Sequence, residues 1–132
     1  MKTSNATKSA LIFVCLVGFT LAKADCGDPQ TQLELNECAA EEYEAADKEL
    51  NAVYSSYRKS LPAESKTMLK EAQSAWIKFR DLSCAFEASG SIGGSIYHMV
   101  LSSCLAEKTR IRTEEIKKLG ACEEGDLTCA PR

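Results

Sequence analysis

The amino-acid sequence predicts an all-α fold: a small antiparallel three-helix bundle stapled by disulfides. Three observations lead to this prediction. Apolar residues recur every three or four positions in three long segments, which is the spacing of one face of an α-helix. Short connections join the segments, and short connections make consecutive helices antiparallel. Six cysteines follow residue 24, and a small exported domain commonly uses such a set as a disulfide framework.

Residues 1–24 have the composition of a secretory signal peptide. A basic start, MKTSNATK, precedes the apolar run SALIFVCLVGFTLA, and AKA before Asp25 has the form of a cleavage site. The apolar run is short for a membrane span, so we expect cleavage near Ala24 rather than a stable membrane anchor. The prediction is a periplasmic or secreted protein with a helical domain at 25–121 and a short tail at 122–132.

The exported part of the chain is acidic. Removing residues 1–24 removes Lys2, Lys8 and Lys23 and no acidic residue, so 13 Lys and Arg remain against 19 Asp and Glu, a net charge of −6. Nucleic acid demands a basic surface, so this charge argues against a nucleic-acid partner. It leaves a cationic protein open as a partner.

The first helix is expected to begin after Thr31 and to run to about Ser60. Glu34 follows Thr31 by three residues, as in a capping box. Pro62 suits the first turn of a second helix, so Ser60 or Leu61 closes the first. The apolar stripe of the first helix comprises Leu35, Ala39, Glu42, Ala46, Leu50, Val53 and Tyr57.

The second and third helices flank SGSIGGS, residues 89–95, which is a turn by composition. The third helix is expected to start near Ser95, and Gly120 is a natural stop. The stripe of the second helix comprises Met68, Leu69, Ala72, Trp76, Phe79, Ser83 and Phe86. The stripe of the third comprises Tyr97, Val100, Leu101, Cys104, Lys108 and Ile111.

The stretch AQSAWIKFRDLSC, residues 72–84, places an arginine beside an aspartate. At about 100° per helical residue, Arg80 lies at the edge of the second stripe and Asp81 points towards water, so the two need not pair. Glu42 lies within the first stripe, level with Arg80 if the chain folds back at residue 61. We predict a structural Arg80–Glu42 ion pair rather than a catalytic site, because burying either charge alone would be costly.

The six cysteines are expected to form local disulfides. Sequence alone does not fix the pairing, and Cys38–Cys84 remains possible. Zinc is the alternative, but no CxxC motif occurs and the chain has one histidine. We therefore predict no metal site, and the favoured pairs are Cys26–Cys38, Cys84–Cys104 and Cys122–Cys129.

Three segments resemble a known family in their order, their spacing and the cysteines at 26, 38, 84 and 104: TQLELNECAAEEYEAADKELNAVY, AQSAWIKFRDLSCAFEA and GGSIYHMVLSSCLAEKTRIR. They are similar to the small exported bacterial domains named for the LprI lysozyme inhibitor, especially the YecT-type proteins. The resemblance covers nearly all of residues 26–119. It implies a helical, disulfide-bonded periplasmic domain and, for a few members, inhibition of lysozyme. The tail CEEGDLTC looks like an addition, and His98 stands where relatives are expected to have proline.

Two surfaces are candidates for contact with a protein partner. An acidic row opposite the first stripe would attract a cationic lysozyme, although such rows are usually solvated helix faces; it comprises Glu34, Glu37, Glu41 and Glu44. The glycine-rich turn could present polar groups to the two catalytic carboxylates of lysozyme, or be a plain turn capped by Ser95. Its candidates are Ser91, Ser95, Tyr97 and His98.

Catalysis has little support in the sequence. No nucleophile–base pair is evident from the spacing, and neither a CxxC redox motif nor a phosphate-binding GxxxxGK loop occurs. We therefore expect a binding protein without catalytic residues or cofactor, which inhibits lysozyme by occlusion.

The alternative is a structural or adaptor module of the cell envelope. A saposin-like lipid binder is a third hypothesis, which the acidic first helix and the lack of paired N-terminal cysteines argue against. Oligomeric state is not predicted.

Overall fold

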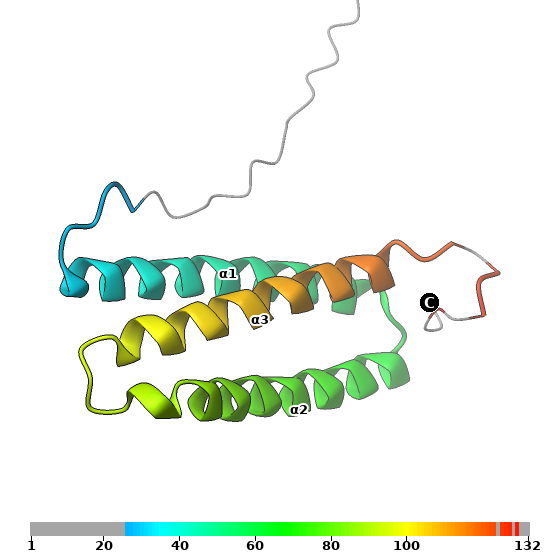
Figure 1. Cartoon of the computed structure of the whole chain (residues 1–132). Helices are drawn as coiled ribbons and strands as arrows, with labels where there is room; N and C mark the ends of the chain where they lie inside the picture. Colours follow the sequence, from blue (N-terminus) through cyan, green and yellow to red (C-terminus); the bar gives the residue numbers. More distant parts are fainter. Residues whose placement is uncertain (1–25, 124, 128, 130–132) are drawn as a thin grey trace, which may run out of the picture.

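The computed structural model describes residues 26–123, 125–127 and 129, so the predicted signal peptide lies outside them. The helices are α1 (Gln32–Ser60), α2 (Ala63–Glu87) and α3 (Tyr97–Gly120), with a 3₁₀ turn, η1 (Ser89–Ser91), between α2 and α3 (Figure 1). The predicted all-α, three-helix architecture is confirmed. None of the helices in the described ranges is long and apolar enough to cross a membrane.

The ends of α1 are set by local hydrogen bonding, as the sequence predicts. The side chain of Thr31 accepts from the backbone N–H of Glu34 at 3.2 Å, and the Glu34 carboxylate accepts from the backbone N–H of Thr31 at 3.0 Å. This reciprocal pair is the predicted capping box. Leu61 caps the C-terminus of α1, and Pro62 is the N-cap of α2.

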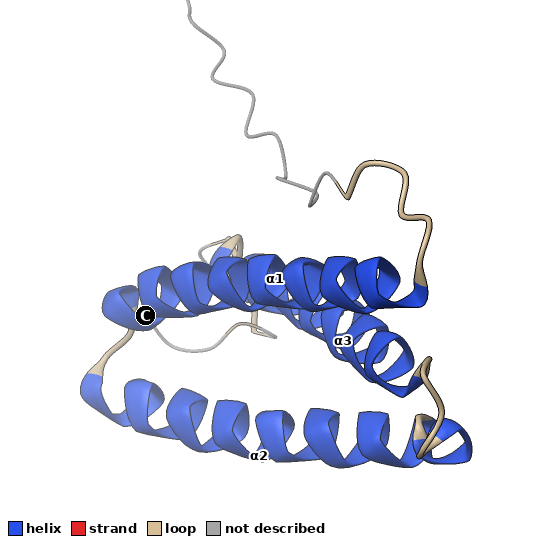
Figure 2. Ribbon diagram, turned by 90° about the vertical axis from the view of Figure 1, so that its left-hand side faces the viewer, coloured by secondary structure: helices blue, strands red, loops and turns tan. Residues whose placement is uncertain are grey.

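The three helices do not pack equally on one another. α1 and α3 run side by side in the same direction, while α2 runs antiparallel to both and lies nearer to α3 (Figures 1 and 2). The core joins α1 to α3 through Leu50, Tyr57 and Ile116, and Leu69 and Trp76 of α2 pack against it. The hairpin of α1 and α2 that the short turn at 61 suggests is therefore not the main interface.

All three favoured disulfides are present. Cys26–Cys38 ties the chain that precedes α1 onto that helix, Cys84–Cys104 joins α2 to α3, and Cys122–Cys129 closes the tail. The Cα–Cα distances of 5.4, 5.6 and 5.8 Å lie in the usual range for disulfides.

The buried face of α1 agrees with its predicted stripe, but the faces of α2 and α3 differ. Met68, Phe79 and Phe86 of the predicted α2 stripe are 64%, 61% and 79% exposed. In α3, Ile111 is 54% exposed. The residues that turn inward are Leu69, Gln73, Trp76, Arg80 and Cys84 of α2, and Ala106, Thr109, Thr113 and Ile116 of α3.

The rotation of α2 has a physical cause. The apolar stripe of a helix faces the core when burial of apolar surface is the main contribution to the orientation of that helix. Here Arg80 is bound by groups from both other helices, and the fully buried Cys84 is bonded to Cys104. These specific bonds orient α2 with its polar edge inward and much of its apolar surface in water.

Candidate protein-binding surface

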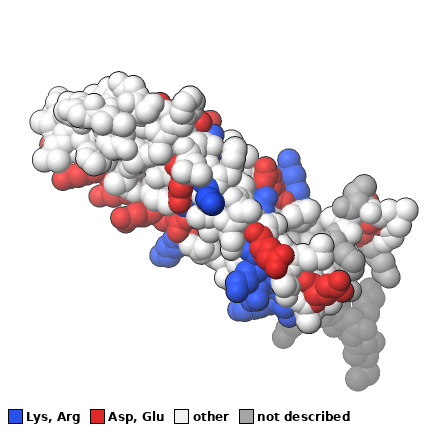
Figure 3. Space-filling model, turned by 90° about the horizontal axis from the view of Figure 1, so that it is seen from below, with Lys and Arg blue, Asp and Glu red and all other residues white. Residues whose placement is uncertain are grey.

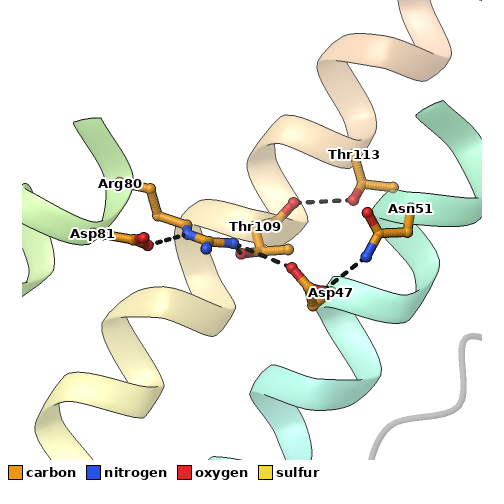
Figure 4. Close-up of polar contacts among 6 residues, drawn as sticks. All are labelled: Asp47, Asn51, Arg80, Asp81, Thr109 and Thr113. Atoms are coloured by element: carbon orange, nitrogen blue, oxygen red, sulfur yellow. Dashed lines mark hydrogen bonds and ion pairs between the residues drawn. The ribbon is translucent and has the colours of Figure 1, made fainter. Parts of the chain in front are cut away.

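Arg80 occupies the junction of the three helices and is only 5% exposed (Figure 4). Its Nε donates to Oδ1 of Asp81 at 2.9 Å, and its Nη1 donates to Oδ1 of Asp47 at 3.3 Å and to Oγ1 of Thr109 at 3.1 Å. These bonds link α2 to α1 and α3, because Asp47 belongs to α1 and Thr109 to α3. The cluster therefore holds the bundle together.

Two aromatic rings complete the surroundings of the guanidinium. Its central carbon lies 5.3 Å from the ring centroids of both Tyr43 and Trp76, within the range of cation–π attraction. Burial alone would lower the pKa of Arg80, but the hydrogen bond to Asp81, the nearby Tyr43 and the Asp47 carboxylate together raise it. Burial also raises the pKa of Tyr43, and the positive charge of Arg80 partly opposes this.

The predicted Arg80–Glu42 ion pair is wrong. Glu42 instead accepts from Nη2 of Arg110 on α3 at 3.0 Å. The reason is that α1 packs mainly on α3, so the α1 acid that Arg80 reaches is Asp47, five residues further along. The expectation that Asp81 need not pair is also corrected, because a helical angle places only the Cβ atom, and the long arginine side chain bends back to its neighbour.

The polar edge of α2 is its inner edge. Gln73, seven residues before Arg80, accepts from Nε of Arg112 at 3.0 Å. Glu87, seven residues after it, pairs with Lys108 at 3.0 Å. All three residues therefore bind α3 and are engaged within the fold.

The acidic residues of α1 fall into two groups. Glu42, Asp47 and Glu49 face the other helices and pair with Arg110, Arg80 and Lys117. The predicted acidic row lies outside, and all four of its members are exposed. Glu34 is engaged in the capping box, whereas the other three form no ion pair with any described residue. From here on, the term acidic row refers to these three residues: Glu37, Glu41 and Glu44.

The hydrogen bonds of Glu34 change its titration. Backbone N–H groups of Gln30 and Thr31 donate to its Oε2 at 2.7 and 3.0 Å, and together with the Thr31 side chain they lower the pKa of Glu34 below its ordinary value of 4.5. Glu34 is thus fixed as an anion at the start of α1, where the positive end of the helix dipole also favours it.

Asn36 joins the start of α1 to the turn before α3. Its Nδ2 donates to the carbonyl of Ser95 at 3.0 Å, and its Oδ1 accepts from the backbone N–H of Met99 at 3.2 Å. The side chain of Ser95 makes no cap on α3, whose N-cap is Ile96. The proposed Ser95 cap is therefore wrong, because Asn36 supplies an acceptor from another helix. Asparagine is a weak helix former, so its presence within a predicted helix could have indicated that the Asn36 side chain has a specific hydrogen-bonding role.

The polar candidates of the turn differ in their exposure and in their contacts. Ser91 is half-buried and donates to the carbonyl of Ala88 at 2.8 Å, while Ser95 and His98 are exposed. The rings of Tyr97 and His98 meet edge to face with centroids 5.4 Å apart. Gly93 has φ of +82°, which few other residues adopt, so glycine shapes this turn.

The turn, which lies at one end of the molecule, is uncharged. Residues 88–106 contain no Asp, Glu, Lys or Arg. Figure 3 shows this end as a white surface with acidic side chains along one edge, while basic groups lie further along the molecule. Ile92 and Ile96 of the turn are 69% and 43% exposed. An uncharged, partly apolar surface thus adjoins an acidic flank, an arrangement suited to a protein partner.

Two further features do not form part of this surface. A pocket of about 300 Å³ lies between the C-terminal halves of α1 and α3, where Lys117 bonds to Glu49 and Glu114. Ligand-type atoms of Cys26, Cys38 and Glu42 lie within 4.8 Å of one another, but the two sulfur atoms are joined as a disulfide. They are therefore not available as thiolate ligands in the oxidised protein.

Comparison with known proteins agrees with this architecture. A family model described as lysozyme inhibitor LprI matches residues 22–116. An uncharacterised protein of Rhizobium meliloti strain 1021 is 40% identical over 108 residues, which cover 72% of this chain and 78% of that protein. The crystal structure of a DUF1311 family protein from Pseudomonas putida matches with a TM-score of 0.64 and 24% identity, over 74% of this chain and 99% of the other, which shows a shared fold. The chain belongs to the LprI lysozyme inhibitor family.

Proposed function

We propose that this protein is exported to the periplasm or beyond the cell and inhibits a lysozyme by covering its active-site cleft, without turning over a substrate. One observation carries the proposal: an acidic row without internal counter-charges begins at the same end of the molecule as an uncharged, exposed turn. Family membership supports a lysozyme as the partner, and three disulfides suit an oxidising compartment.

The two parts of the surface would contribute differently to binding. The acidic row attracts a cationic enzyme and raises the rate of encounter. It cannot enter the cleft itself, because the two catalytic carboxylates of a lysozyme would repel it. The turn carries no charge, so it is the part that enters, with Ser95 and His98 as exposed donors for those carboxylates.

The acidic row is tested by removing its charge. Glu37→Gln, Glu41→Gln and Glu44→Gln in one variant should weaken inhibition of peptidoglycan hydrolysis by about tenfold or more, since rim charges mainly affect association. The matched control changes three exposed acids elsewhere, Glu71, Glu107 and Glu123, to Gln. Equal inhibition by both variants, whether weakened or not, would show that the position of the row does not matter and would remove the row from the contact surface.

The turn is tested by adding a charge. Ser95→Glu would place a carboxylate opposite the enzyme's own carboxylates, so inhibition should be lost while the fold, followed by circular dichroism, is kept. Ser74→Glu, at an exposed position of α2, is the control and should inhibit normally. Full inhibition by Ser95→Glu would exclude the turn from the cleft.

A second candidate function, an adaptor module of the cell envelope, is favoured by the apolar surface that α2 leaves in water. An adaptor would bind an envelope protein without affecting any lysozyme. Retrieval of one defined envelope protein, together with full lysozyme activity at large excess, would decide for the adaptor.

A further inference from the structure

The exposed apolar residues of α2 follow a regular spacing. Met68, Phe79, Leu82 and Phe86 are 64%, 61%, 62% and 79% exposed, and two exposed alanines lie between them. In order, the positions are separated by four, three, four, three and four residues, which is the repeat of a helix that packs along another helix. We call this set the outer seam of α2: Met68, Ala72, Ala75, Phe79, Leu82 and Phe86.

The outer seam is not covered within the described fold. α2 meets the other helices through its polar edge, about 100–140° around the helix axis from the seam, where Gln73, Arg80 and Glu87 bind α3. The seam contains no charged residue, and a contiguous apolar surface of this kind on a small protein marks an interaction site.

We propose that the outer seam binds the outer seam of a second copy of this chain, with the two α2 helices antiparallel. The order of large and small residues is self-complementary in this arrangement. A two-fold axis near residue 77 sets Met68 opposite Phe86 of the other copy. It sets Ala72 opposite Leu82, and Ala75 opposite Phe79. Each alanine thus faces a large side chain, and no large pair collides at the centre.

The area of the seam suits a dimer. An aromatic side chain buries about 150–250 Å² when it is fully covered. Two phenylalanines and two other large side chains, 61–79% exposed, therefore offer roughly 400–650 Å² per copy. Two copies would therefore bury roughly 1,000 Å² from these side chains alone, which reaches the lower bound for a specific interface. The flanking residues add to this area.

The dimer would leave the proposed lysozyme surface free. The acidic row lies on α1, which packs against α3 and has little contact with α2. Because the helices pair antiparallel, the two turns would lie at opposite ends of the dimer. Dimerisation through α2 therefore does not depend on whether the protein binds lysozyme.

Sedimentation velocity over a concentration series of the oxidised protein tests the dimer. We expect a reversible monomer–dimer equilibrium. Phe79→Glu and Leu82→Glu should each raise the dissociation constant about tenfold or more, because each buries a charge in the interface. Ile111→Glu, at an exposed apolar position of α3, is the matched control and should associate normally. A monomer at every concentration would overturn the proposal. So would a dimer whose dissociation constant is unchanged by both Phe79→Glu and Leu82→Glu.

The register is tested by exchanging one large–small pair. Ala75→Phe should weaken the dimer, because the new ring meets Phe79 of the other copy. Adding Phe79→Ala to the same chain restores a large–small pair, so the double variant should dimerise again. Unspecific apolar association predicts the opposite: tighter association of Ala75→Phe and no rescue. That outcome would contradict the antiparallel pairing.

Discussion

Arg80 joins α2 to both other helices through its bonds to Asp47 and Thr109. Its position at the edge of a helical stripe could be predicted from the sequence, and so could its need for a counter-charge. Its partners could not, because they depend on which two helices lie together. A structural role is consistent with the bonds of Arg80 to Asp47, Asp81 and Thr109, which all lie within the fold.

Replacing Arg80 should destabilise the protein. Arg80→Met removes the bonds to Asp47 and Thr109 and should lower the free energy of unfolding by about 2–3 kcal/mol. The cost stays moderate because the side chains of Asp47 and Asp81 are 40% and 53% exposed and remain hydrated. Urea denaturation is the measurement. Lys78→Met, at an exposed position of the same helix, should change little; an Arg80→Met variant of unchanged stability would contradict the structural role.

Glu34 should make stability depend on pH. Its pKa is lowered in the folded state, so its contribution is present above its unfolded-state pKa and is lost as the pH falls through the folded-state pKa. Glu34→Gln should therefore be less stable than the unmodified protein at pH 7, and the difference should vanish well below about pH 4.5. Urea denaturation at both pH values measures this, with Glu37→Gln as control. A difference that persists at low pH would refute the capping role.

At the scale of the elements, the sequence predicts helix ends better than helix faces. The capping box and the Leu61–Pro62 break are local, so a few neighbouring residues determine them. The stripe of α1 also agrees with its prediction, because apolar burial orients that helix. The faces of α2 and α3 depend on distant partners, such as Thr109 for Arg80 and Cys104 for Cys84. Spacing alone carries no information about these partners.

The Cys84–Cys104 disulfide should stabilise α2 more than α1. α2 shares little of the apolar core and is joined to α3 by this bond and by polar contacts. Replacing both cysteines by alanine opens a link across 20 residues and should cost about 3 kcal/mol. Hydrogen exchange should show the larger loss of amide protection in α2.

The control for that experiment is the tail disulfide. Replacing Cys122 and Cys129 by alanine should leave the protection of all three helices unchanged, since this bond spans 7 residues outside them. Equal loss of protection in α1 and α2 after removal of Cys84–Cys104 would show that the bundle opens as one unit, and would contradict a separate dependence of α2 on this bond.

For the molecule as a whole, the distribution of charge distinguishes the helix–helix contacts from the surfaces that face water. The inward-facing acids of α1 are paired, the acidic row of α1 faces water, and the turn carries no charge. The acidic row and the turn could be proposed from the sequence, because composition alone marks them. Their proximity could not, since it depends on the bonds from Asn36 to Ser95 and Met99. The outer seam of α2 could not be predicted either, because apolar spacing places most of its large residues in the core.

Salt should affect lysozyme binding in a defined direction. If the acidic row guides a cationic enzyme to the turn, added salt screens that attraction and slows association. Stopped-flow or biosensor kinetics should show the effect mainly in the association rate. An association rate that does not change between low and physiological salt would contradict guidance by the row.

Lysozyme inhibition by occlusion is tested most directly by titrating lysozymes of several classes with the oxidised protein while peptidoglycan hydrolysis is followed. We expect the activity of at least one class to fall in proportion to added protein and to be lost at about one copy per enzyme, as occlusion of a single cleft requires. Full activity of every class at large excess of the protein would contradict inhibition.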